Sequence, residues 1–195
     1  MAANSSTPRP GRSWTGDVKG YESLHNDPRF AALFARFSDP ITKYIEMLGV
    51  NREKIEVYYT RAWGTISRGG EKIHLHSHKQ SHISLVYYLK KPAGSSGISF
   101  TDYDAPNEFA PNIFHESMVK SEILRKIQQL NAVTVNLNPS EGDVLLFPSK
   151  TTHAIVPNKS DEPRISIAVD IVITVKDSKG LEYLLPNLDT WKAMA

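Results

Sequence analysis

The chain has 195 residues and a nearly balanced charge, with 23 lysines and arginines against 21 aspartates and glutamates. This length suits one domain with a substantial core, and the scattered basic residues do not indicate a partner such as nucleic acid or a membrane surface. The absence of cysteine excludes disulfides, thiolate metal sites and a cysteine nucleophile. No apolar run of the sequence is long enough to span a membrane.

The first 16 residues, MAANSSTPRPGRSWTG, lack the apolar segment of a signal peptide, and we expect a disordered lead-in there. Residues 17–195 are expected to form one domain, with helical support at about 22–50 and a barrel core at about 54–176. These features favour a cytoplasmic protein that is a monomer or a homodimer.

A helix is predicted in the segment SDPITKYIEMLG, because its apolar residues would share one face: Ile41, Tyr44, Ile45 and Leu48. Asp39 would be the N-cap, Pro40 the first helical residue, and Gly49 would follow the helix end. A shorter helix is expected just before it, in PRFAALFARF.

From residue 54 onward the patterns are those of short strands separated by turn-forming clusters such as SRGG, KPAGSSG, NPSEG and NKSDEP. The predicted strands are KIEVYYTRAW, EKIHLHSH, HISLVYYLKK, GISFTD, VTVNL, DVLLFPS, THAIVP and RISIAVDIVITV. HESMVKSEILRKIQQLNA interrupts them as an expected helical insert. This arrangement predicts a mainly β fold, a jelly roll with the N-terminal helices packed on one sheet.

Three histidines at alternate positions are the first functional signal. In an extended strand His74, His76 and His78 would share one face. Such a stripe can be an idle solvent-exposed face, but here it leads into ISLVYYL, which is apolar on both faces and therefore buried. Buried imidazoles must be hydrogen-bonded or ligated, and imidazole is a common ligand of iron, zinc, copper and nickel. His153, which opens a later predicted strand, is the candidate for a further ligand.

A buried arginine is the second signal. In RISIAVDI, Arg164, Ser166 and Ala168 alternate with apolar residues, so one face of the predicted strand would carry a guanidinium and a hydroxyl. If this face lines a barrel, Arg164 is a buried cation that requires an anion. A carboxylate of a bound ligand could accept two parallel hydrogen bonds from it.

These residues resemble the iron(II)/2-oxoglutarate-dependent oxygenases, and more narrowly the small oxygenases with the signature H-x-H-P-x-S-x-x-S-G-V-Y-Y, which are distantly prolyl-hydroxylase-like. The segment HSHKQSHISLVYY, from His76 to Tyr88, matches this signature without a gap, with Lys79 in place of the proline and Leu85 in place of the glycine. The similarity extends over roughly residues 63–173.

The resemblance implies a double-stranded β-helix, a cupin-like barrel, that holds one iron(II) through His76, His78 and His153. It also implies that 2-oxoglutarate binds the iron while Arg164, helped by Ser166 and Tyr88, binds the far carboxylate, and that dioxygen is the co-substrate. The expected activity is hydroxylation of an unactivated C–H bond in a small molecule, an amino acid or a short peptide.

One feature departs from most of this superfamily, which combines two histidines with one carboxylate in an H-x-D or H-x-E motif. Here His78 stands at the carboxylate position, and three neutral ligands leave the site one unit more positive. Two other ligand sets therefore stay open. His74 could act with His76, or Asp102 or Asp104 could complete the set.

Other functions fit parts of the pattern. GDVLLFPSKTTHAIVPN resembles the second cupin motif, although Lys150 replaces its glycine. That reading gives a three-histidine dioxygenase or a zinc or nickel isomerase, neither of which uses 2-oxoglutarate. A binding module without catalysis would retain only the barrel. Arg164 and Ser166 favour the oxygenase over the three-histidine cupin dioxygenase, because they have no assigned role in that reading, and metal analysis would separate the isomerase.

Overall fold

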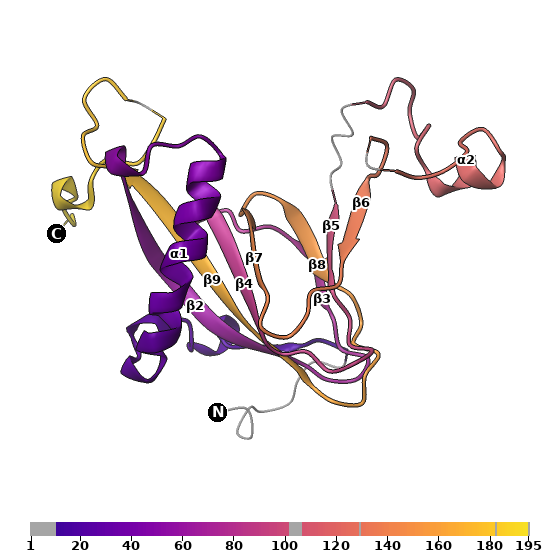
Figure 1. Cartoon of the computed structure of the whole chain (residues 1–195), viewed down its shortest axis with the longest axis horizontal. Coiled ribbons are helices and arrows are strands. Elements are labelled where there is room, and N and C mark those ends of the chain that lie inside the picture. Colours follow the sequence, from indigo (N-terminus) through magenta and orange to yellow (C-terminus); the bar gives the residue numbers. More distant parts are fainter. Residues whose placement is uncertain (1–10, 102–106, 129, 182, 195) are drawn as a thin grey trace.

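The structure is a computed structural model that describes residues 11–101, 107–128, 130–181 and 183–194. Its body consists of two antiparallel sheets that face each other (Figure 1). The larger sheet has the order β1-β2-β9-β4-β7 and the smaller one the order β3-β8-β5-β6. This is the mainly β, jelly-roll architecture of a double-stranded β-helix, as the sequence predicted.

The eight predicted strands all form, and their bounds are β2 (Ile55–Ser67), β3 (Ile73–His76), β4 (Ile83–Lys90), β5 (Ile98–Thr101), β6 (Thr134–Leu137), β7 (Val144–Pro148), β8 (Thr152–Ile155) and β9 (Arg164–Val175). A ninth strand, β1 (Trp14–Thr15), pairs with the end of β2. The side chain of Trp14 is buried, so ordered structure begins within the lead-in that the sequence predicted to be disordered. Residues 1–10 of that lead-in lie outside the described residues.

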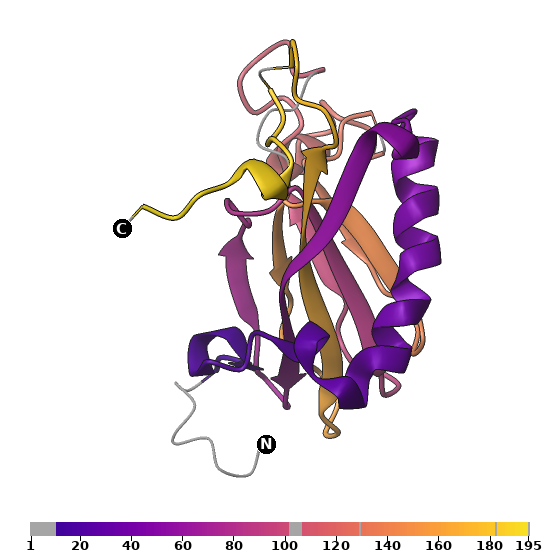
Figure 2. The same cartoon turned by 90° about the vertical axis from the view of Figure 1, so that its left-hand side faces the viewer.

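Helix α1 (Ala31–Met47) covers the outer face of the larger sheet (Figure 2). Its buried residues Phe34, Phe37, Ile41 and Ile45 form the main core with apolar residues of β2, β4 and β9. Short 3₁₀ turns lie at Asp17–Lys19, Leu24–Asn26, Pro28–Phe30, Arg52–Lys54 and Leu188–Thr190. Within the described ranges, no helix is both long and apolar enough to cross a membrane.

The two predicted N-terminal helices are one continuous helix, and Asp39 is not its N-cap, because Pro40 lies inside α1. Pro40 has no N–H and leaves the carbonyl of Arg36 without an intrahelical donor. Arg36 is exposed, so water can reach that carbonyl. Burial of one apolar face on both sides of Pro40 offsets the lost hydrogen bond. Gly49 follows the helix end with φ of 78°, as predicted.

The helical insert predicted over residues 115–132 is mostly not helical. Among the described residues of this range only α2 (Glu116–Lys120) is helical, with the His115 side chain accepting a hydrogen bond from the N–H of Ser117. Figure 1 shows this segment projecting from the β5–β6 end of the smaller sheet. Ile123 and Ile127 remain exposed, so no packed apolar face supports a longer helix.

We predict that Phe37→Ala lowers the free energy of unfolding by about 3–5 kcal/mol, because it leaves a cavity where a nearly fully buried ring packs between α1 and the sheet. Met47→Ala in the same helix is the control, since the Met47 side chain is 86% exposed. Urea unfolding measures both variants. Equal stability of the two would show that α1 does not contribute to the core as described.

Candidate metal centre

A cavity of about 320 Å³ lies between the two sheets. Its walls come from eight strands, from the 3₁₀ turn that begins at Asp17 and from the turn after β3. Its lining includes three histidines and two aromatic side chains: His76, His78, His153, Trp63 and Phe147. The inward faces of both sheets therefore meet at one polar, partly aromatic space.

The three predicted metal ligands lie together in this cavity. His76, at the end of β3, is directly opposite His153 of β8 in the strand register, and His78 follows in the turn after β3. One ring nitrogen from each histidine lies within 4.8 Å of the others. The ring centroids of His76 and His153 are 4.3 Å apart, and each is 5.3 Å from that of His78.

Hydrogen bonds fix which nitrogen each ring presents. Nδ1 of His76 lies 2.8 Å from the carbonyl of His74, and Nδ1 of His153 lies 2.9 Å from the carbonyl of Thr151. Nδ1 of His78 lies 2.5 Å from a carboxylate oxygen of Asp170. These oxygens can only accept, so each Nδ1 is the donor and each Nε2 keeps its lone pair. This donor set could hold a metal ion through three imidazole nitrogens.

Burial holds two of these rings in the neutral form that ligates metals. Desolvation lowers the pKa of His153 to about 4, and it also lowers the pKa of His76. Because a metal ion competes with protons for Nε2, these rings are ready to bind at neutral pH.

His74 does not belong to the group, and the expectation that it shares a face with His76 is wrong. Between Ile73 and His76 the register of β3 shifts by one residue relative to Ile155 and His153 of β8. Such a bulge breaks the alternation of side chains, so Ile73 and His76 both line the cavity and His74 is exposed. Asp102 and Asp104, the other candidates, lie outside the described residues.

Arg164, Ser166 and Tyr88 lie beside one another on the inward side of the larger sheet. Ser166 lines the cavity and pairs with Tyr88 across the β4–β9 register. Arg164 is two residues along the same face of β9, and its guanidinium carbon lies 5.9 Å from the centre of the Tyr88 ring. The prediction that one face of this strand carries polar groups inside the barrel is confirmed by the burial of both Arg164 and Ser166.

Arg164 is only partly satisfied by the protein. It donates to the carbonyl of Ser96 and to the hydroxyl of Ser67, both at 3.1 Å. Its Nε and the Tyr88 hydroxyl are buried without a hydrogen-bond partner, and no carboxylate of the described chain forms an ion pair with it. Desolvation lowers the pKa of Arg164 and raises that of Tyr88 to about 12. Orphaned polar atoms of this kind fit a ligand that accepts hydrogen bonds.

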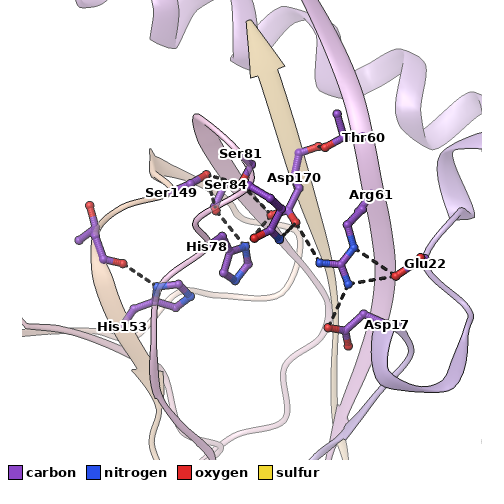
Figure 3. A network of polar contacts seen from close by, with 12 residues as sticks. Asp17, Glu22, Thr60, Arg61, His78, Ser81, Ser84, Ser149, His153 and Asp170 are labelled. Atoms are coloured by element: carbon purple, nitrogen blue, oxygen red, sulfur yellow. Dashed lines mark hydrogen bonds and ion pairs between the residues drawn. The ribbon is translucent and has the colours of Figure 1, made fainter. Parts of the chain in front are cut away.

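Asp170 is a site residue that the sequence analysis did not identify. It continues the polar face of β9 and is fully buried, with His78, Gln80 and Ser81 hydrogen-bonded to its carboxylate (Figure 3). The alternation that predicted Arg164 and Ser166 would have found it two positions beyond Ala168.

Comparison with protein families finds one match. Residues 61–170 fit the model of the family described as "Putative 2OG-Fe(II) oxygenase". The matched range contains the three histidines, Tyr88, Arg164 and Asp170. None of the curated proteins compared with the chain shows significant similarity to it.

Solved structures with a similar fold include an oxidoreductase of the 2OG-Fe(II) oxygenase family from Burkholderia pseudomallei, at 12% identity and a TM-score of 0.53. That match covers 75% of this chain and 59% of the Burkholderia chain. HygX from Streptomyces hygroscopicus, solved with nickel and 2-oxoglutarate, is 14% identical with a TM-score of 0.52, covering 87% of this chain and 74% of its own. At these identities the likeness concerns the fold alone.

We predict that the protein binds about one Fe(II) per chain and that His153→Ala and His78→Ala lose it, since two imidazoles hold the ion poorly. His74→Ala is the matched control, because His74 is exposed and is not part of the histidine group, so removing it should leave the iron content unchanged. Anaerobic loading, desalting and an iron assay measure the content. Wild-type iron in His153→Ala, or loss of iron in His74→Ala, would contradict the ligand assignment.

Proposed function

The chain belongs to the 2-oxoglutarate- and iron(II)-dependent oxygenase family, and from this premise we propose that it hydroxylates an unactivated C–H bond of a small molecule, an amino acid or a short peptide. The family is one of oxidoreductases that use iron(II), 2-oxoglutarate and dioxygen, as the sequence analysis expected. The observation that carries the proposal is Arg164, a buried cation with unused donors beside a cavity lined by three convergent histidines.

In this proposal His76, His78 and His153 hold the iron through Nε2. The bound iron, with 2-oxoglutarate and dioxygen, supplies an oxidation of the substrate coupled to decarboxylation of the keto acid to succinate. The protein contributes orientation of the three rings through their Nδ1 hydrogen bonds. The rings of Trp63 and Phe147 border the histidines, with centroids 5.7 Å from His78 and 4.9 Å from His153, and they limit the access of water.

Arg164 is proposed to bind the distal carboxylate of 2-oxoglutarate. Two of its five N–H donors are used by Ser96 and Ser67, which leaves Nε–H and one N–H on each terminal nitrogen. The Tyr88 hydroxyl and Ser166 add two more groups on the same side. The guanidinium cannot act as an acid or base in the reaction, so its role is to position the keto acid.

The size of the cavity supports a small substrate. A volume of about 320 Å³ lies at the lower end of the range for ligand pockets and has to accommodate 2-oxoglutarate as well. A small molecule, or one side chain of a peptide, suits the remaining space better than an extended polymer. Whether the outcome is hydroxylation, desaturation or ring formation depends on the substrate. A cytoplasmic location and a monomer or homodimer remain predictions from the sequence.

A three-histidine cupin dioxygenase or isomerase that uses no keto acid is the second candidate, because the metal-ligand group found among the described residues contains no carboxylate. This function would leave the donors of Arg164 and the Tyr88 hydroxyl unexplained inside the protein. Keto-acid binding therefore distinguishes the two candidates.

We predict that Arg164→Ala weakens binding of 2-oxoglutarate at least a hundredfold, because removing one partner of a buried charge pair costs about 3–5 kcal/mol and every 1.4 kcal/mol is roughly tenfold in affinity. Arg164→Lys should recover only part of the loss, since an ammonium cannot make two parallel bonds. Anaerobic titration of the Fe(II) protein, followed by its metal-to-ligand charge-transfer absorption, measures the affinity.

Arg36→Ala, which removes an exposed arginine of α1, is the control and should bind 2-oxoglutarate like the wild type. Iron content should be normal in all three variants, because Arg164 contacts none of the histidines. Wild-type affinity in Arg164→Ala, or no keto-acid binding by the wild type, would exclude the proposed oxygenase and favour the keto-acid-free cupin.

A further inference from the structure

Asp170 carries a charge in the middle of the central strand β9. It has no exposed surface, and its neighbours Val169 and Ile171 are core residues. Burying a carboxylate is costly unless several donors compensate for the lost water. The groups that donate hydrogen bonds to the Asp170 carboxylate therefore indicate what role it has in the fold.

Its shortest contact is with a proposed metal ligand. Oδ1 accepts from Nδ1 of His78 at 2.5 Å and from the hydroxyl of Ser81 at 3.2 Å, while Oδ2 accepts from the side-chain amide of Gln80 at 3.0 Å. Figure 3 shows the carboxylate between the His78 ring and the guanidinium of Arg61. The contacts on both oxygens fix the plane of the carboxylate and, through it, the plane of the ring.

The three histidines differ in this respect. Nδ1 of His76 and of His153 each face a neutral backbone carbonyl, whereas Nδ1 of His78 faces a charged group. Among the described residues, therefore, only His78 of the three histidines has a carboxylate partner at Nδ1. His78 is also the residue at the position where most of the superfamily has a carboxylate ligand. A hydrogen bond from a ligating imidazole to a carboxylate fixes the ring and makes the ring a stronger donor to the metal.

Arg61 lies close enough to reduce this charge but does not neutralise it. It is 3.6 Å from Asp170 and forms shorter contacts with Glu22, at 3.0 and 3.1 Å, and another contact with Asp17 at 3.4 Å. One guanidinium is thus shared among three carboxylates. The charge on Asp170 is left available to His78.

We propose that Asp170 is a positioning residue of the metal centre. Asp170 does not bind the metal itself but acts through His78, whose ring it orients. It also places a negative charge next to the metal site, whereas in a site with two histidines and one carboxylate that charge belongs to a metal ligand. This inference rests on the proposed function, because it requires the metal to bind at the three histidines.

The first test is Asp170→Asn, which keeps the size of the side chain and an oxygen acceptor but removes the charge. Affinity for Fe(II) under anaerobic conditions, and for Co(II) as a spectroscopic substitute, should fall about 10–100-fold. The Fe(III)/Fe(II) midpoint potential of the loaded protein should rise, because the neutral amide no longer stabilises the additional positive charge of Fe(III). A role confined to folding would change the unfolding temperature of the metal-free protein and leave the potential unaltered.

Arg61→Gln is the second variant, and it should shift the midpoint potential in the opposite direction to Asp170→Asn. It keeps the inference testable if Asp170→Asn does not fold. Removing the cation that competes for Asp170 should lower the midpoint potential and leave metal affinity equal or higher. Lys43→Gln, which removes a cation exposed on the surface of α1, is the control and should change neither quantity.

The outcomes separate the two proposals. A wild-type protein that binds no metal overturns the proposed function. A wild type that binds metal, with Asp170→Asn within twofold in affinity and unchanged in potential, overturns the role of Asp170 alone. An unchanged or raised potential in Arg61→Gln overturns that role as well.

Discussion

Strand β9 has a strand on each edge and packed side chains on both faces, so its buried polar groups need partners either from the protein or from a bound ligand. It pairs with β2 along one edge and β4 along the other. Its residues Ile167, Val169 and Ile171 belong to the core under α1. The other face of β9 is directed toward the smaller sheet and carries Arg164 and Asp170. The core and the proposed metal centre therefore lie on the two faces of one strand, and the alternation of side chains along the strand determines which residues face each of them.

The two charges on that face are compensated to different extents. Asp170 is surrounded by donors from the protein, and its carboxylate is an integral part of the histidine cluster. Arg164 has two acceptors and keeps a buried donor without a partner, next to an equally isolated tyrosine hydroxyl. A buried charge that the protein satisfies supports its own architecture, whereas one that it leaves open indicates a ligand. This contrast supports the proposed positioning role of Asp170 and the proposed ligand-binding role of Arg164.

Much of this could be predicted from the sequence, because a regular strand has a strict period of two. That period placed Arg164 and Ser166 on one inward face, and it would have placed Asp170 there too. It failed for His74, since the bulge between Ile73 and His76 is a feature of the pairing with β8 that the residues of β3 alone do not reveal. Pro40, which local preference places at a helix start, lies inside α1 because burial of one long apolar face outweighs that preference.

An anaerobic crystal structure of the protein with iron(II) and 2-oxoglutarate tests the central claim most directly. The account predicts iron on Nε2 of His76, His78 and His153, with the distal carboxylate of the keto acid against the guanidinium of Arg164 and the Tyr88 hydroxyl. Iron held by His74 or by an acidic residue in place of one of these histidines, or a keto acid bound away from Arg164, would contradict it.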